Sequence, residues 1–338
     1  MDIQVDYRLT SFTTNPAVLT PAYRPCHTPS LISTNPTLTI CLTYHPLIPN
    51  SYTMAEEPPP PRPSRTLTNR VAIITGAGAQ GNGIGNGRAS AILLAADGCS
   101  VVCVDLNLSL AQTTVSMIEA EGKGRAIAIQ ADVTSSADCE RIVTTTLSTF
   151  GRLDILFNCV GIGGAPGTAV DVDMDAWAKG LEVNVSSMVR MCKFAIPAML
   201  KNDRSLGIRG SIINMGSVAG LRGGTPHLLY PTSKGAVVNM TKAMAAHHAA
   251  DGIRVNCVCP GMVYTPMMYG PGMSEAAREG RKNRSLLKIE GNGWDIGNSV
   301  RFLAGEESRW ITGHVLTVDA GATCAVGTDL PRSASVNA

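Results

Sequence analysis

The sequence carries little charge and few aromatic side chains. Lys, Arg, Asp and Glu make up 16% of the 338 residues, the formal net charge is +2, and aromatic residues account for 4%. A balance this close to neutral gives no broad electrostatic surface for nucleic acid or an anionic membrane, so we expect neither as a partner. No apolar run approaches the roughly 18–20 residues that a membrane-spanning helix needs. Hydrophobic residues make up 44% of the chain, which is ample for a sizeable core and excludes disorder throughout.

Glycine and proline are unevenly distributed. No glycine occurs before residue 71, whereas twelve of the 20 prolines fall at or before Pro63. Residues 1–53 are almost uncharged, show no persistent helical or strand period, and lack the pattern of a secretory signal or a mitochondrial presequence. We therefore expect a disordered Thr/Pro-rich extension and linker over residues 1–66, a folded domain over 67–322 and a tail over 323–338. The extension is expected to be dispensable, with a docking tail as the alternative.

The ten cysteines show no pattern of a metal site. The sequence has no CxxC pair and no His cluster at zinc spacing, so no metal is expected. Several cysteines sit within apolar stretches, which favours buried free thiols in a reducing, cytoplasmic compartment. Cys257 and Cys259 lie two residues apart on an expected strand and are expected to face opposite sides.

Apolar runs alternate with helical patterns from residue 70 onward. The runs resemble strands of a buried parallel sheet and lie at residues 71–75, 100–105, 126–131, 154–158, 211–214, 254–258 and 315–318. Helical patterns lie at residues 88–97, 108–121, 137–150, 175–200 and 233–251. This alternation predicts an α/β fold with a doubly wound parallel sheet, a Rossmann fold in a single domain. Such folds place ligands at the carboxyl ends of the strands.

A glycine-rich loop over residues 75–87 follows the first expected strand and opens a helix. Backbone N–H groups in such a loop approach a pyrophosphate without obstruction by Cβ atoms, and the helix dipole favours the negative charge. Because a strand precedes the loop and a helix follows it, we expect dinucleotide binding. The candidate contacts in this loop are Gly76, Ile84, Gly85 and Gly87.

Three strand ends add further cofactor candidates. Asp105 ends the second strand, where a carboxylate accepts hydrogen bonds from the ribose hydroxyls and repels a 2′-phosphate, which favours NAD over NADP. Asp132 closes the third strand and is placed to contact the adenine ring. Asn158 closes the fourth strand and begins residues 158–161, placed to pass beside the adenosine ribose.

Tyr230 and Lys234 form the candidate catalytic pair. Residues i and i+4 of a helix share a face, so Lys234 is expected beside Tyr230. A free phenol has a pKa near about 10, and a nearby ammonium typically lowers a pKa by roughly 1–3 units. Tyr230 is then suited to exchange a proton with a carbinol or carbonyl oxygen while a hydride moves on carbon. Ser217 precedes Tyr230 and is placed to hold the substrate oxygen.

With these motifs the sequence resembles the classical short-chain dehydrogenase/reductase family, over about residues 68–321. The resemblance rests on an ordered set of motifs: residues 75–87, Asp132-Val133, residues 158–161, Asn184, Ser217, Tyr230-xxx-Lys234, Pro260-Gly261 and residues 318–321. A Tyr-xxx-Lys motif alone is common by chance, whereas the ordered set is specific.

The resemblance implies a role for each matching residue. Tyr230 would be the proton donor or acceptor, Lys234 would lower its pKa and bind the nicotinamide ribose, and Ser217 would orient the substrate oxygen. Asn184 would hold a water that links Lys234 to solvent. The backbone of Val263 and the hydroxyl of Thr265 would contact the nicotinamide carboxamide. The family also implies a homodimer or homotetramer.

Three features depart from the family pattern. The glycine loop is longer than usual, and either residues 83–85 or residues 85–87 form its inner glycine pair. We favour 85–87 because Arg88-Ala89 follows it, and Asn86 then replaces the usual Ile. Residues 201–210 lengthen the connection before the fifth strand, and Ala320 stands where the family usually has Gly.

The leading hypothesis is an oxidoreductase that transfers a hydride between NAD and a secondary alcohol or ketone of an apolar small molecule. Residues 264–290 would form a short substrate lid, and its charged stretch 278–288 is expected to be a solvated helix face rather than an anion site. A catalytically idle sensor or scaffold and an epimerase or dehydratase are the alternatives. The alternative cofactor is NADP, which would involve Asn82, Asn86 or Arg88.

Overall fold

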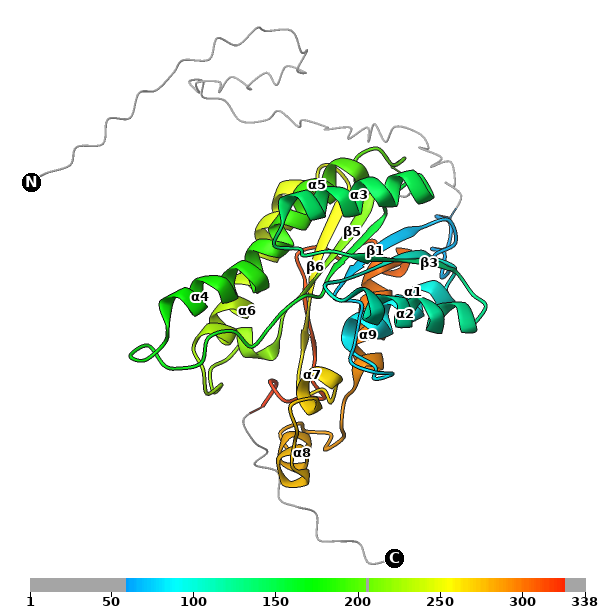
Figure 1. Ribbon diagram of the computed structural model, residues 1–338. Helices are drawn as coiled ribbons and strands as arrows, with labels where there is room; N and C mark the ends of the chain where they lie inside the picture. Colours follow the sequence, from blue (N-terminus) through cyan, green and yellow to red (C-terminus); the bar gives the residue numbers. More distant parts are fainter. Residues whose placement is uncertain (1–58, 205–206, 326–338) are drawn as a thin grey trace, which may run out of the picture. The chain divides into compact units, whose positions relative to one another are not determined.

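The computed structural model describes residues 59–204 and 207–325, and the seven strands within these residues form one parallel sheet (Figure 1). The sheet has the order β3-β2-β1-β4-β5-β6-β7. Its strands are β1 (Val71–Thr75), β2 (Ser100–Asp105), β3 (Arg125–Gln130), β4 (Ile155–Asn158), β5 (Gly210–Met215), β6 (Ile253–Pro260) and β7 (Val315–Val318). The chain runs outward from β1 in one direction and then returns to β4 on the other side of β1. A crevice is therefore expected at the carboxyl ends of β1 and β4.

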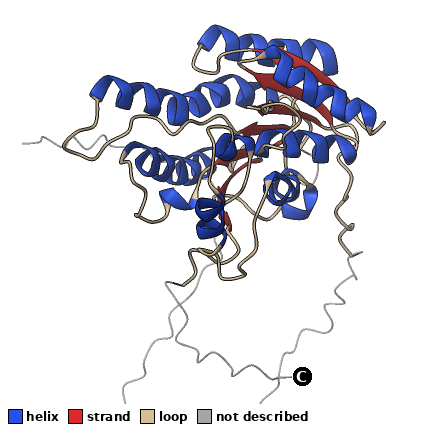
Figure 2. Cartoon of the chain, turned by 60° about the horizontal axis from the view of Figure 1, so that its bottom comes forward, coloured by secondary structure: helices blue, strands red, loops and turns tan. Residues whose placement is uncertain are grey.

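Helices cover both faces of the sheet (Figure 2). Alternate side chains of β1 serve opposite faces: Ala72 and Ile74 belong to one buried cluster, and Ile73 belongs to the other. The first cluster includes α1 (Asn86–Ala96), α2 (Leu108–Ala120) and α9 (Gly293–Ala304), and the second includes α3 (Ser136–Phe150) and α5 (Ser187–Met199). The remaining helices are α4 (Met174–Leu181), α6 (Leu229–His248), α7 (Pro266–Tyr269) and α8 (Glu275–Lys282). Three short segments, η1 (Glu182–Ser186), η2 (Val218–Gly220) and η3 (Glu306–Ser308), complete the elements.

The predicted fold class is confirmed, and every expected strand has a counterpart in the sheet. The expected helix over 175–200 is a continuous helical run in which the π-helical segment η1 separates α4 from α5. Helix α6 begins earlier than expected, at Leu229, which places Tyr230 in its first turn. Helices α7 and α9 were not among the expected helices, whereas α8 overlaps the helix face expected over residues 278–288. Residues 1–58, which hold most of the extension predicted over 1–66, and residues 326–338, which hold most of the tail predicted over 323–338, lie outside the described residues.

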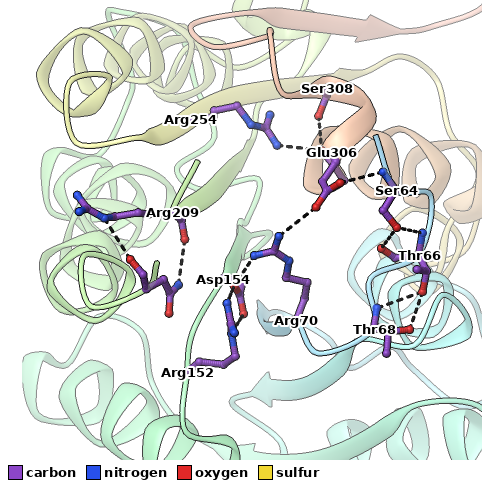
Figure 3. A network of polar contacts seen from close by, with 12 residues as sticks. Ser64, Thr66, Thr68, Arg70, Arg152, Asp154, Arg209, Arg254, Glu306 and Ser308 are labelled. Atoms are coloured by element: carbon purple, nitrogen blue, oxygen red, sulfur yellow. Dashed lines mark hydrogen bonds and ion pairs between the residues drawn. The ribbon is translucent and has the colours of Figure 1, made fainter. Parts of the chain in front are cut away.

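A network of polar side chains ties the amino ends of the strands together (Figure 3). The buried carboxylate of Asp154 accepts hydrogen bonds from Val71 N (2.9 Å), Arg70 Nη1 (3.1 Å) and Arg152 Nη2 (2.7 Å). Arg70 also pairs with Glu306 at 3.2 Å. Because a buried charge is costly unless it is paired and hydrogen-bonded, this network is a structural one. It lies at the end of the sheet opposite the crevice.

Candidate active site

A cavity of about 450 Å³ lies along the carboxyl ends of the strands. The glycine loop lines one part of it, and α6 and the lid line another. Nine of the residues expected to form the site line this cavity: Gly76, Gly85, Gly87, Asp105, Ser217, Tyr230, Lys234, Val263 and Thr265. Five others do not line it: Ile84, Asp132, Val133, Asn158 and Asn184.

Tyr230, Ser217 and Lys234 meet at the start of α6. Lys234 Nζ lies 5.7 Å from the centroid of the Tyr230 ring and donates a hydrogen bond to Met215 O at 2.9 Å. Ser217 follows β5, where its Oγ accepts a hydrogen bond from Ala219 N at 3.1 Å, and its hydroxyl is near enough to the Tyr230 phenol to influence the pKa of that phenol. The end of β5 and the first turns of α6 thus place a phenol, a hydroxyl and an ammonium along one wall of the cavity.

Burial controls the ionisation of this cluster. Desolvation raises the pKa of the Tyr230 phenol, and the neighbouring Ser217 hydroxyl offsets part of that rise. Burial also lowers the pKa of Lys234. The net shift of the Tyr230 pKa is therefore upward, and the causes of that shift do not include Lys234. That Lys234 lowers the pKa of Tyr230 stays a prediction. Tyr230 is a neutral phenol at neutral pH, which is the form that donates a proton.

Asn184 supports the cluster from behind. It is fully buried in η1, and its Nδ2 donates to Ile162 O at 2.9 Å and to Ser233 Oγ at 3.0 Å. Its Oδ1 accepts from Ile162 N at 2.8 Å. Added to Gly161, a Cβ would lie 3.1 Å from Lys234 Nζ and 3.5 Å from Asn184 Oδ1, so both side chains flank the same glycine. Asn184 thus lies close to Lys234 but outside the cavity lining.

Gly87, in the first turn of α1, packs tightly against the two residues that follow β1. A Cβ on Gly87 would lie 2.0 Å from Gly76 O, and Gly76 itself has a φ of +67°. The geometry supports residues 85–87 as the inner glycine pair, since only Gly permits so close a contact. Asn86 Oδ1 also fits a ligand here, because this buried atom has no hydrogen-bond partner within the described residues and Asn86 lines the cavity. The loop therefore fits a dinucleotide.

Asp105 lies at the rim of the same cavity. Its Oδ2 accepts from Gly78 N at 2.9 Å and its Oδ1 accepts from Asn107 N at 3.0 Å. Each oxygen accepts one hydrogen bond from protein, so each retains capacity for a ribose hydroxyl. Arg88 is unsuited to bind a 2′-phosphate, because its guanidinium is fully buried against carbonyl oxygens of the glycine loop.

Asp132 and Asn158 hold other parts of the fold. Asp132 Oδ1 accepts from Thr134 N at 2.8 Å and Thr134 Oγ1 at 2.7 Å, and these bonds lower the pKa of Asp132. Asn158 is buried and donates to Asn214 Oδ1 at 3.0 Å, which links β4 to β5. The residues that follow Asn158, at 159–161, line the cavity in its place.

Comparison with known proteins finds relatives over most of the chain. A family model described as Enoyl-(Acyl carrier protein) reductase matches residues 78–323. The chain is 35% identical to meso-2,3-butanediol dehydrogenase of Serratia marcescens over 259 residues, covering 77% of this chain and 96% of the relative. A solved structure from Burkholderia xenovorans, assigned to the short-chain dehydrogenases/reductases, is 36% identical with a TM-score of 0.72, covering 77% of this chain and 99% of that chain.

The chain belongs to the short-chain dehydrogenase/reductase family. A further solved structure is 7α-hydroxysteroid dehydrogenase complexed with NADH and 7-oxo glycochenodeoxycholic acid. It is 30% identical with a TM-score of 0.69 and covers 76% of this chain and 95% of that chain. As a short-chain dehydrogenase/reductase, the protein is an NAD(P)-dependent oxidoreductase acting on CH–OH groups, and the comparisons support this activity over an idle binding protein.

One lid residue of this short-chain dehydrogenase/reductase was missed. Arg281 lines the cavity and donates to Val263 O at 3.2 Å, whereas Arg278 forms a bidentate pair with Glu290. The charged stretch is therefore not uniformly a solvated face. The sequence does hold a signal for Arg281. The spacing of Arg278, Arg281 and Ser285 places these residues on one face of α8 and its continuation.

The expectation that Cys257 and Cys259 face opposite sides is wrong. Residues two apart on a strand share a face, and the two Sγ atoms lie 3.7 Å apart beneath Gly216. Within residues 59–204 and 207–325, no group of His, Cys, Asp or Glu side chains has the arrangement of a metal site. Across the same ranges, no helix combines the length and apolar character that a membrane crossing requires.

Proposed function

We propose that this oxidoreductase interconverts an apolar secondary alcohol and its ketone with NAD as the preferred cofactor. The observation that carries the proposal is the position of Tyr230, Ser217 and Lys234 in the same cavity as the glycine loop. Met267 and Met268 line that cavity from the lid and suit an irregular apolar ligand. The relative named for butanediol supports a secondary alcohol as the substrate, and the structure solved with a steroid ligand supports a substrate with a large apolar body.

In the proposed mechanism, Ser217 donates a hydrogen bond to the substrate oxygen and orients it toward the phenol. The nicotinamide cofactor supplies the hydride for ketone reduction and takes it up in alcohol oxidation. In reduction Tyr230 donates its phenol proton to the carbonyl oxygen, and in oxidation it accepts the hydroxyl proton. Lys234 supplies a positive charge beside the phenolate that forms. A positioned acid–base group of this kind contributes on the order of 10²–10⁴ in rate.

The two directions should respond oppositely to pH. Because burial raises the pKa of Tyr230, the phenol persists through neutral pH, and the rate of ketone reduction should hold there and fall only at alkaline pH. Alcohol oxidation needs the deprotonated form, so its rate should rise with pH over the alkaline range. Measuring kcat for both directions against pH tests this; an oxidation rate that is flat from neutral to alkaline pH contradicts it.

Asp105 is proposed to select NAD over NADP. Hydrogen bonds to a charged group are worth about 1.5–3 kcal/mol, so Asp105→Ala should raise the Kd for NADH roughly ten- to hundred-fold while changing NADPH binding much less. Titration of nicotinamide fluorescence in the full chain measures both values. Asp105→Asn is the control that keeps an acceptor for Gly78 N but removes the charge. An unchanged ratio of the two Kd values in both variants refutes the assignment.

The assembly and location follow as proposals from family membership. We propose a homodimer or homotetramer in the cytoplasm, as is usual for such oxidoreductases. The cysteines of the described residues are all free, and most are buried, which suits a reducing compartment.

A further inference from the structure

Arg88 is the largest of the fully buried side chains in the described residues. Its Nη1 donates to Gly81 O at 2.8 Å and to Gly83 O at 2.6 Å, its Nη2 donates to Ala79 O at 2.8 Å, and its Nε donates to Thr114 Oγ1 at 3.0 Å. Each of these partners is a neutral oxygen, and among residues 59–204 and 207–325 no carboxylate forms a salt bridge with it. The positive charge inside the glycine loop is therefore compensated without a salt bridge, by the nearby Asp105 carboxylate, which opposes the lowering of the Arg88 pKa by burial.

Three of the four carbonyl groups bound by Arg88 belong to the glycine loop and orient the rest of it, and the fourth is Leu110 O in α2. The described backbone has no cis peptide bond, and in a trans peptide the N–H points away from the preceding C=O. The N–H groups of Gln80, Asn82 and Ile84 therefore point away from the guanidinium. In the described part of the chain, no protein acceptor binds any of these three N–H groups. The loop thus presents donors on the side opposite its buried cation, as an anion-binding loop does.

The lengthened part of the loop also contacts the substrate lid. Added to Gly83, a Cβ would lie 2.5 Å from Pro266 Cγ and 2.5 Å from Tyr269 Oη, both in α7. Added to Gly270, a Cβ would lie 2.8 Å from Gln80 Oε1. Both sides of this contact line the cavity, through Gln80 and Pro266. The loop and the lid thus meet at the edge of the proposed cofactor site.

We propose that Arg88 is a positioning residue of the cofactor site. Its guanidinium holds the loop carbonyls inward, which sets the loop against α7, and this loop–lid contact limits how fast the dinucleotide leaves. The inference rests on the proposed binding of a nicotinamide dinucleotide in this cavity. The extra length of the glycine loop does not by itself produce this contact. Without the hydrogen bonds from Arg88, a glycine-rich loop has many other conformations.

Gly83→Ala tests the loop–lid contact directly. The added methyl group meets Pro266 and Tyr269, so the lid must move while the Arg88 contacts, which use only backbone oxygen at Gly83, are kept. We expect the dissociation rate constant of NADH to rise about ten-fold, a change worth about 1.4 kcal/mol. The measurement is stopped-flow displacement of NADH by excess NAD, followed by nicotinamide fluorescence. Limited proteolysis of the lid without cofactor should also become faster.

Gly280→Ala is the matched control. It makes the same substitution in α8 of the lid, where a Cβ would meet nothing within 4 Å. NADH release and lid proteolysis should be unchanged in this variant. Equal release rates in Gly83→Ala and Gly280→Ala overturn the loop–lid part of the proposal.

Arg88→Met and Arg88→Lys test the positioning role. Methionine keeps much of the apolar stem but binds no carbonyl, so we expect the Kd for NADH to rise at least about ten-fold. Lysine keeps the charge but has no fork to bridge the carbonyls of Ala79, Gly81 and Gly83, so we expect an intermediate Kd. A folded Arg88→Met protein that binds NADH as tightly as the wild type overturns the role. If Arg88→Met does not fold, Arg88→Lys and Gly83→Ala carry the test. Absence of NADH binding by the wild type would instead refute the proposed function.

Discussion

Tyr230→Phe is expected to lower kcat on the order of 10²–10⁴ in both directions, with little change in the Kd for NADH. Phenylalanine fills the same space in the first turn of α6 but has no proton to exchange with the substrate oxygen. The measurements are steady-state turnover of a secondary alcohol with NAD and a fluorescence titration with NADH.

Tyr264→Phe is the control for this prediction. This variant also removes one phenol hydroxyl, but from the lid. There the centroid of the Tyr264 ring lies 4.1 Å from Arg278 Cζ and 4.8 Å from the centroid of the Tyr269 ring. Turnover close to the wild-type value is expected. If Tyr230→Phe retained turnover within a few-fold of the wild type, another group would have to move the proton, and Ser217 would be the next candidate.

Gly87→Ala is expected to be the most damaging of the glycine substitutions. The new Cβ would lie 2.0 Å from Gly76 O and 2.8 Å from Gly76 C, which are backbone atoms that cannot rotate away. Helix α1 must therefore shift from β1. Overpacking of this kind costs about 1–3 kcal/mol, and each kcal/mol lowers Tm by about 2–4 °C in a domain of this size. NADH binding should be lost with the loop geometry.

Two further Gly→Ala variants separate the steric effect at Gly87 from any general effect of replacing glycine by alanine. A Cβ at Gly85 would meet only the side chain of Ala79, at 3.3 Å, so Gly85→Ala should give a smaller loss. Gly280→Ala, which meets nothing, should leave both Tm and NADH binding unchanged. A Tm for Gly87→Ala equal to that of Gly280→Ala would show that α1 packs less closely on β1 than described.

The sheet could be predicted from sequence because its strands are buried on both faces. The apolar run of β1, which packs Ala72, Ile73 and Ile74 against two helical layers, has no polar interruption to obscure it. The pairing of Tyr230 with Lys234 was equally accessible, since it depends only on the helical period. Both features depend on residues that are close together in the sequence, so the sequence alone is enough to predict them.

Burial and polar partners could not be predicted in the same way. The direction of the Tyr230 pKa depends on desolvation by distant segments, which no spacing reports. Arg88 follows a run of glycines and has the sequence context of an exposed cation, yet it is fully buried. Asn158 ends a strand at the expected place, but its side chain binds Asn214 on the neighbouring strand. Each outcome depends on which segments meet in space.

The π-helical segment η1 sets the direction in which Asn184 points. A π-helix accommodates an additional residue within an otherwise regular helix. Removing one residue from Glu182–Ser186 would restore an α-helix through α4 and α5, and each residue of an α-helix turns the chain by about 100°. Asn184 would then rotate away from Ile162 and Ser233, whose hydrogen bonds it now makes. The orientation of Asn184 therefore depends on the length of this helix to the single residue, and we expect a one-residue deletion here to remove the hydrogen bonds that Asn184 makes behind the active site.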